Sequence, residues 1–339
     1  MRSLVAFICL AQLLSWATAL SVPPIRDPNC DDPDVEQAAL AAVQYVNNNH
    51  KHGYKYALNQ VDKARVYQRR PSGEMYLLEI DLLETTCHVL DPTPLENCTV
   101  RQLAEHAVEG DCDVGVLKVN NQFIVTNAKC ESSPDSAEDV RKVCPNCPLL
   151  APLNDTKVVH AVEAALNAFN AQNHSNYFKL LEISRAQYSP LQASVYTEFV
   201  TVPTDCAPTG VIDPAACNPL PGQHGFCKAT LTQKAGGEDV AATCTVFAAA
   251  PAVPDGIEPS PEPSVALPAH LDELHSVLPG NPIVSHLPHH DLRHSILGGA
   301  SFESASGERG SNPGPAAPGP GPAAPAIPLC PGRIRHFKI

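Results

Sequence analysis

The first amphipathic stretch of the chain covers residues 36–49, EQAALAAVQYVNNN. Its apolar residues recur every three or four positions, as in a helix that buries one face, and they are Ala39, Val43 and Val46, with Leu40 beside them. Asp34 precedes this stretch and is a candidate N-cap. The pattern predicts a helix near the N-terminus that packs one face on a core.

The same organisation recurs in the second half of the chain. Residues 160–173, HAVEAALNAFNAQN, are expected to turn Ala165, Leu166 and Phe169 inward. After each predicted helix come strand-like runs and then four cysteines, with steps of 11, 14 and 18 residues in the first set and 11, 10 and 17 in the second. The cysteines are Cys87, Cys98, Cys112 and Cys130, then Cys206, Cys217, Cys227 and Cys244. These two copies indicate a duplicated α+β domain.

Proline separates the folded part from the C-terminal part. Of the 34 prolines, 17 follow residue 250, and residues 313–328 read PGPAAPGPGPAAPAIP. Such a sequence buries too little apolar surface to offset its ordering entropy. We therefore predict a first domain at 27–133, a linker at 134–147, a second domain at 148–252 and a largely disordered Pro/Gly/Ala-rich tail at 253–339, tethered through Cys330.

The N-terminus predicts secretion. Arg2, an apolar run from Leu4 to Leu14 and the triplet Ala17-Thr18-Ala19 fit a signal peptide covering residues 1–19. Its removal takes Cys9 with it and leaves twelve of the 13 cysteines, an even number as a fully paired extracellular protein requires. No later segment is apolar enough to predict a membrane span.

Charge narrows the class of partner. The chain has 23 Lys and Arg against 36 Asp and Glu, a net charge of −13. Nucleic-acid binding requires a basic face, so the composition argues against it and favours cations or basic partners. No enzyme is predicted either, because all cysteines of the mature chain are expected to be paired and no G-x-S-x-G, H-E-x-x-H or phosphate-binding glycine loop occurs. No catalytic residue or catalytic cofactor is therefore expected.

Longer strings resemble a known family. A helix, antiparallel strands and Thr85-Thr86-Cys87 with the next cysteine eleven residues on resemble the cystatin fold. The strings CDDPDVEQAALAAV, LETTCHVLDPTP, HAVEGDCD, SSPDSAEDVRKVC, CPLLAPLNDTKVVHA and CPGRIRHFKI are similar to the fetuin family of the cystatin superfamily. The resemblance implies two tandem cystatin-like domains and the disulfides Cys30–Cys330, Cys87–Cys98, Cys112–Cys130, Cys144–Cys147, Cys206–Cys217 and Cys227–Cys244.

Protease inhibition, the activity best known among cystatins, is only weakly indicated. Inhibitory cystatins insert a Gln-x-Val-x-Gly hairpin, whereas the matching segments here read QRRPS at 68–72 and QYSPL at 187–191, without the valine or glycine. Another branch of the fetuin family carries a CPDCP linker whose Asp reaches the zinc of astacin-type metalloproteases. Here Asn146 takes that place and lacks the charge that favours zinc binding. A small disulfide that fixes the domain crossing is the favoured reading of this linker.

Acidic residues at strand spacing are the main candidate site. Glu79 and Asp81 are two residues apart, so in a strand they share a face, where carboxylates are suitable ligands for Ca²⁺. A solvated strand face is the alternative reading. Charge complementation at a helix N-terminus is favoured for a second cluster, Asp31, Asp32, Asp34 and Glu36. The resemblance favours calcium phosphate binding by the acidic sheet of the first domain, with weak, multisite Ca²⁺ binding.

Several modification sites are predicted. Three N-x-S/T sequons place glycans at Asn97, Asn154 and Asn173. The resemblance implies phosphorylation at Ser132, Ser133 and Ser136, and S-x-E motifs add Ser301 and Ser306. The histidines of the tail, His286, His289, His290 and His294, are expected to be solvated, with weak binding of Zn²⁺ or Cu²⁺ as the alternative.

Together these features predict a secreted, non-enzymatic glycoprotein of plasma and bone matrix. It would bind calcium and calcium phosphate, inhibit ectopic mineralisation and act as a mineral carrier or opsonin. The alternative is a binding antagonist of the insulin receptor or of TGF-β-family ligands that uses residues 113–129. A residual protease inhibitor is the third reading.

Overall fold

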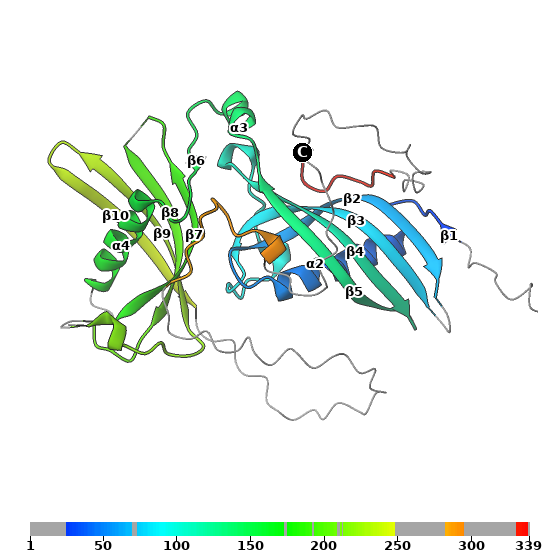
Figure 1. The fold of residues 1–339 in the computed structure, drawn as a ribbon, viewed down its shortest axis with the longest axis horizontal. Helices are drawn as coiled ribbons and strands as arrows, with labels where there is room; N and C mark the ends of the chain where they lie inside the picture. Colours follow the sequence, from blue (N-terminus) through cyan, green and yellow to red (C-terminus); the bar gives the residue numbers. More distant parts are fainter. Residues whose placement is uncertain are drawn as a thin grey trace, which may run out of the picture.

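The computed structural model describes residues 25–69, 73–172, 175–191, 193–208, 211, 213–247, 282–294 and 330–337. They form two α+β domains, each with a long helix across a twisted antiparallel sheet (Figure 1). The duplicated architecture predicted from the sequence is confirmed. The predicted signal peptide lies outside the described residues. None of the helices in the described ranges has both the length and the apolar character needed to cross a bilayer.

In the first domain, helix α2 (Pro33–Asn49) packs on a sheet with the strand order β1-β2-β3-β4-β5. The predicted stripe of α2 is buried, whereas Leu40 on its flank is 45% exposed. Asp32, and not Asp34, is the N-cap, because the rigid Pro33 already occupies the first helical position. The strands are β1 (Ile25–Arg26), β2 (Tyr54–Gln68), β3 (Glu74–His88), β4 (Val108–Val119) and β5 (Gln122–Pro134).

The second domain repeats this plan with helix α4 (Thr156–Asn170) and the strand order β10-β9-β8-β7-β6. Ala165, Leu166 and Phe169 are buried against the sheet, as predicted. Small alanines at the centre of both helices let each helix approach its sheet closely. The strands are β6 (Leu149–Leu150), β7 (Phe178–Tyr188), β8 (Ser194–Pro203), β9 (His224–Lys234) and β10 (Gly237–Phe247).

Short helical elements lie in the connections. Helix α3 (Ala137–Val143) forms within the predicted linker, where the hydroxyl of Ser136 accepts a hydrogen bond from the Asp139 N–H and caps it. Turns of 3₁₀ helix are η1 (Leu95–Asn97), η2 (Leu103–Glu105), η3 (Pro214–Ala216) and η4 (Leu292–His294).

Six disulfides connect the described residues, in the same pairs that the family resemblance implies. They join Cys30 to Cys330, Cys87 to Cys98, Cys112 to Cys130, Cys144 to Cys147, Cys206 to Cys217 and Cys227 to Cys244. Cys112–Cys130 and Cys227–Cys244 bridge directly opposed residues of neighbouring strands in the two domains. Disulfides on this scale fit an extracellular protein.

A buried charge network joins the two domains. The Arg185 guanidinium on β7 contacts the Glu84 carboxylate on β3 at 3.1 Å and donates to the carbonyls of Glu105 and His106 at 2.6 and 2.7 Å. Arg101 pairs with Glu198 of β8 at 2.6 Å, and its guanidinium lies over the Tyr54 ring. Burial opposes ionisation of Glu198, but Arg101 lowers the pKa of this carboxyl to about 2. The network holds two arginines against two glutamates, so the charges of these four side chains balance.

Two segments of the predicted tail pack on the domains. Residues 282–294 lie between the domains, drawn in orange in Figure 1, and Leu292 enters the core of the first domain. Residues 330–337 follow β2, where the N–H groups of Cys330 and Arg335 donate to the carbonyls of Asp62 and Asn59. The prediction of an unpacked tail is therefore wrong for both segments, because each supplies groups that complete a domain. Residues 282–294 supply a leucine to the core. Residues 330–337 supply N–H donors to β2, where its register with β3 is irregular.

Candidate functional site: an acidic sheet face

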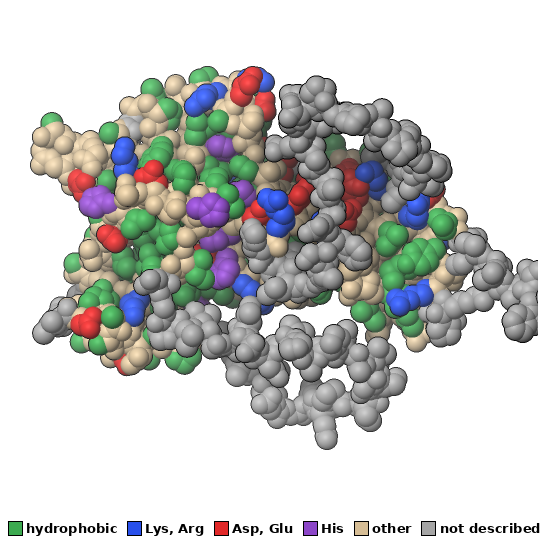
Figure 2. Space-filling view, in the orientation of Figure 1, with side chains coloured by type: hydrophobic (Ala, Val, Ile, Leu, Met, Phe, Trp, Pro, Cys, Tyr) green, Lys and Arg blue, Asp and Glu red, His purple; other side chains and the backbone are tan. Residues whose placement is uncertain are grey.

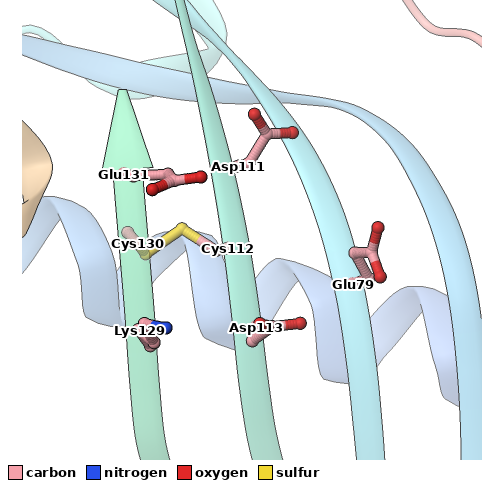
Figure 3. A pocket seen from close by; sticks show the side chains of 7 residues that line it. All are labelled: Glu79, Asp111, Cys112, Asp113, Lys129, Cys130 and Glu131. Atoms are coloured by element: carbon pink, nitrogen blue, oxygen red, sulfur yellow. A yellow bond between two sulfur atoms is a disulfide. The ribbon is translucent and has the colours of Figure 1, made fainter. Parts of the chain in front are cut away.

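Six carboxylates lie on the sheet face opposite α2. Alternation along the strands turns Ile80, Cys112 and Cys130 toward the helix core and their neighbours outward. The strand register forms one row from Glu79, Asp113 and Lys129 and a second row from Asp81, Asp111 and Glu131. Figure 3 shows the first row, with Asp111 and Glu131 of the second, around the Cys112–Cys130 disulfide. The acidic face, as we call it, comprises Glu79, Asp81, Glu109, Asp111, Asp113 and Glu131.

The acidic face is electrostatically unfavourable to the fold. Partial burial raises the pKa of Asp111, and the charges of Glu131, Asp62, Glu79 and Asp113 add to this effect. Burial and a hydrogen bond with Asp135 raise the pKa of Glu109 to about 8. Like charges directly opposed on neighbouring strands destabilise a sheet. A bound cation would relieve this repulsion.

The two acidic residues predicted from the sequence share one face but differ in exposure. Glu79 is 37% exposed at its side chain and pairs with Lys63. Asp81 shares this face but is only 8% exposed, so its carboxylate is largely withdrawn from solvent, unlike that of Glu79. Asn59 donates to the Asp81 carboxylate at 2.8 Å, and the same amide donates to the carbonyl of Phe337 at 2.9 Å. Asn59 therefore links Asp81 to the C-terminal segment.

We expect Asp81→Asn to stabilise the protein in a pH-dependent way. Burial raises the pKa of Asp81 from its usual 3.8 to about 7. Well below pH 3.8 the carboxyl is neutral in both states, but between pH 3.8 and 7 only the unfolded state loses the proton, so folding becomes less favourable as pH rises. The melting temperature of Asp81→Asn should thus exceed that of the wild type at pH 8, and the difference should be much smaller at pH 4. Glu96→Gln, at an exposed site, serves as the control; an equal difference at both pH values would contradict this account.

The exposed members of the acidic face were missed at the sequence level. Asp111, Asp113 and Glu131 are exposed on β4 and β5. The sequence pattern that could have identified them is the alternation in residues 109–113, EGDCD, and 129–131, KCE. In a strand, acidic residues on either side of a buried cysteine point to the face of the sheet opposite that cysteine.

The second domain lacks this concentration of charge. Around Cys227–Cys244, the positions that correspond to Asp111, Asp113 and Glu131 are Phe226, Lys228 and Thr245. Of the carboxylates near the first disulfide, only Glu79 has an acidic counterpart, Glu198, which pairs with Arg101 in the domain junction. The cystatin fold therefore does not require the acidic face.

The acidic face is an open array. Across the described ranges, no group of three or more His, Cys, Asp or Glu side chains is arranged to hold one metal ion. The strands lie about 4.8 Å apart, and alternate residues along each strand lie about 6.7 Å apart. Such an array can contact several ions at once, each through one or two carboxylates.

The second acidic cluster has structural roles. Asp32 caps α2, Asp34 contacts Lys118 at 2.6 Å, and Glu36 pairs with Arg333. The Asp31 carboxylate accepts the Arg333 N–H at 2.8 Å. These contacts agree with the reading favoured from the sequence, with the C-terminal segment as an additional partner.

The three predicted phosphorylation sites differ in access. Ser133 and Ser136 are exposed, and Ser133 lies opposite Glu109 at the end of the acidic face. Ser132 points the other way and is 6% exposed, with its hydroxyl accepting the Leu292 N–H at 3.1 Å. Residues 282–294 therefore contribute to the burial of Ser132. Ser301 and Ser306 lie outside the described residues.

The remaining predicted sites lie in the connections between strands and near strand ends. Asn97 and Asn154 are exposed, as glycan acceptors must be, and Asn173 lies outside the described residues. In the first inhibitory-type loop, residues 70–72 lie outside them as well. In the second, Gln187 donates to the carbonyls of Glu105 and Pro148 and is engaged at the domain junction.

Comparison with known proteins places the chain in a family. The cystatin domain family matches residues 24–121 and 147–236. Alpha-2-HS-glycoprotein of pig (Sus scrofa) is 54% identical over 363 residues, covering 99% of this chain and 100% of the pig protein. The human (Homo sapiens) protein of that name is 51% identical over 369 residues, with 100% of both chains covered.

Solved structures agree on the fold. Mouse fetuin-B in complex with crayfish astacin has a TM-score of 0.58 at 23% identity, covering 69% of this chain and 71% of that chain. Mouse fetuin-B in its inhibitory complex with human meprin beta has a TM-score of 0.59 at 24% identity, covering 67% and 76%. At these identities the likeness concerns the fold alone. The chain belongs to the cystatin family and, within it, to the alpha-2-HS-glycoprotein (fetuin-A) family.

Proposed function

We propose that this secreted chain is a non-enzymatic mineral-binding glycoprotein. It binds calcium and nascent calcium phosphate through the acidic face, inhibits ectopic mineralisation in plasma and bone matrix, and carries or opsonises the particles. One observation supports this most strongly: six carboxylates gather on one sheet face despite their repulsion, whereas the duplicated domain keeps a single equivalent carboxylate.

The open geometry suits a mineral surface better than a free ion. Hard carboxylate oxygens are preferred Ca²⁺ ligands, but a tight site needs six to eight oxygens around one ion. The acidic face offers fewer oxygens to each ion, but several ions can bind along it at once. Weak contacts made together raise the affinity for a particle far above that for one ion. Affinity for free Ca²⁺ is therefore low, and affinity for calcium phosphate is high.

Phosphorylation would extend the acidic face. Ser133 follows Glu131 on the same side of β5, so a phosphate there adds up to about two negative charges beside Glu109 and Glu131. Glycans at Asn97 and Asn154 would keep coated particles apart.

A precipitation assay with native and dephosphorylated protein in parallel tests the proposal. We expect the dephosphorylated protein to retain inhibition at a raised half-maximal concentration, because the carboxylates of the acidic face remain. Complete loss of inhibition on dephosphorylation would assign the activity to the phosphates and contradict the proposed role of the acidic face.

The other readings have less support. Fetuin-B forms the complexes with astacin and meprin beta, but this chain carries Asn146 where the metalloprotease-binding branch carries Asp. Antagonism of the insulin receptor or TGF-β-family ligands by residues 113–129 stays a prediction from the family resemblance.

A further inference from the structure

Residues 282–294, which we call the clasp segment, contact both domains. On the second domain, the Ile283 N–H donates to the Leu181 carbonyl at 3.0 Å, and the Ile183 N–H donates back to Ile283 at 3.2 Å. Further along, the Leu153 N–H donates to the Leu287 carbonyl at 3.2 Å. The first half of the clasp segment is therefore bound along β7 and beside the start of α4.

The second half of the clasp segment enters the first domain. Leu292 is 0% exposed and belongs to that domain's core. It fits beside Gly110, where an added Cβ would lie 3.0 Å from the Leu292 side chain. The Leu292 N–H donates to the Ser132 hydroxyl, and a His289 ring nitrogen lies 3.1 Å from the Ser132 carbonyl.

Between these two anchors, histidines of the first domain and of the clasp segment surround one buried carboxylate of the second domain. Glu182 of β7 is 2% exposed; its oxygens lie 3.0 Å from the His52 ring, 3.1 Å from the His88 ring and 3.3 Å from the His290 ring. The Gly53 N–H and the Ser184 hydroxyl also donate to this carboxylate. Figure 2 shows histidine side chains gathered between the two domains.

Charged and titratable groups face the clasp segment from every element around it. Arg293 within the segment pairs with Asp291. The other groups are His50 and His52 after α2, His88 and Glu84 on β3, Glu131 on β5, Glu182 and Arg185 on β7, and His224 on β9. Arg185 and Glu84 are already paired, which leaves the buried His50 and His290 as the groups whose protonation the packed state opposes.

We propose that the clasp segment is a pH-sensitive latch, which holds the two domains together at neutral pH and is released in mildly acidic solution. The driving force is the preferential binding of protons to histidines that release exposes to water. Release also uncovers Ser132.

The direction follows from the buried histidines. Burial and the neighbouring His290 lower the pKa of His50 to about 3, and burial lowers the pKa of His290. In the released state the pKa of these rings is near 6.5. The free energy that favours the closed state is therefore greatest well above pH 6.5 and decreases as the pH falls below it. Each ring shifts the equilibrium by up to about tenfold per pH unit. Burial opposes ionisation of Glu182, but its hydrogen bonds with His52 and His88 hold its pKa well below the usual value. The Glu182 carboxylate in turn favours the charged form of His290, and burial outweighs this effect, so the pKa of His290 stays lowered.

Hydrogen exchange of the full glycoprotein tests the latch. We expect the protection factors of the Ile283 and Leu292 amides, corrected for intrinsic exchange, to fall between pH 7.5 and 5.5 by about tenfold for each ring that stays neutral in the closed state, and so by up to about a hundredfold for His50 and His290 together. Amides of β3 and β4 should keep their protection. Unchanged protection of the clasp segment, or an equal loss over the whole chain, would overturn the proposal.

Variants connect the effect to the histidines. His50→Leu with His290→Gln removes both titrating rings, so the ratio of clasp protection between the two pH values should shrink to within about threefold, whatever the absolute protection. His160→Gln changes an exposed histidine on α4 and should keep the wild-type ratio. If the double variant does not fold, His290→Gln alone should reduce the ratio about tenfold. A variant ratio equal to that of wild type would also overturn the proposal.

Discussion

Replacing Asp111, Asp113 and Glu131 together by Asn, Asn and Gln should remove most of the protein's ability to delay calcium phosphate precipitation. These are the exposed members of the acidic face. If each carboxylate contributes about 0.5–1 kcal/mol to adsorption, as exposed ion pairs do, the half-maximal concentration should rise roughly ten- to a hundredfold. The substitutions also remove opposed like charges, so the variant should fold at least as stably as wild type.

The control must match the change in net charge. Glu96→Gln, Glu163→Gln and Asp239→Asn remove three exposed carboxylates outside the acidic face. This variant should inhibit precipitation as wild type does. If both triple variants lose the same potency, net charge and not the arrangement on the sheet governs mineral binding.

Arg185→Ala should destabilise the protein by about 3–5 kcal/mol, the usual cost of breaking a buried ion pair from one side. The Arg185 side chain is 3% exposed and satisfies both the Glu84 carboxylate and two backbone carbonyls of the first domain. Its removal leaves a buried carboxylate with Arg101 as its remaining cationic partner and leaves the junction with net negative charge. Because Arg185 connects the domains, we also expect unfolding to separate into two transitions.

Denaturant unfolding followed by circular dichroism measures this effect. Arg26→Ala removes an arginine from an ion pair with Glu74, where the Arg26 side chain is 55% exposed, and should cost less than about 1 kcal/mol. Comparable small losses for both variants would show that the buried network does not hold the domains together.

Local patterns were enough to predict the domains. The helical stripes of α2 and α4 and the two sets of four cysteines depend on residues near one another in the chain, so periodicity and spacing identify them. The start of α2 was misplaced by two residues because Asp34 and Asp32 both suit an N-cap, and only the position of Pro33 in the helix decides between them.

The exposure of the acidic face could not be predicted in this way. Strand alternation correctly places Glu79 and Asp81 on one face, but Asp81 is buried and bonded to Asn59, whose amide also binds the Phe337 carbonyl 278 residues away in the sequence. The position of the clasp segment could not be predicted for the same reason. Its histidines suggested a solvated tail, but its position depends on Leu292, which fits beside Gly110. Contacts between such distant segments leave no periodic signal.

Carboxyl footprinting tests the central claim most directly. The protein is labelled at Asp and Glu with a water-soluble carbodiimide and an amine, with and without calcium phosphate particles, and the labelled residues are identified by mass spectrometry. We expect the particles to protect Asp111, Asp113 and Glu131 while Glu96, Glu163 and Asp239 stay reactive. Uniform protection, or protection confined to carboxylates outside the acidic face, would contradict the assignment of mineral binding to this sheet.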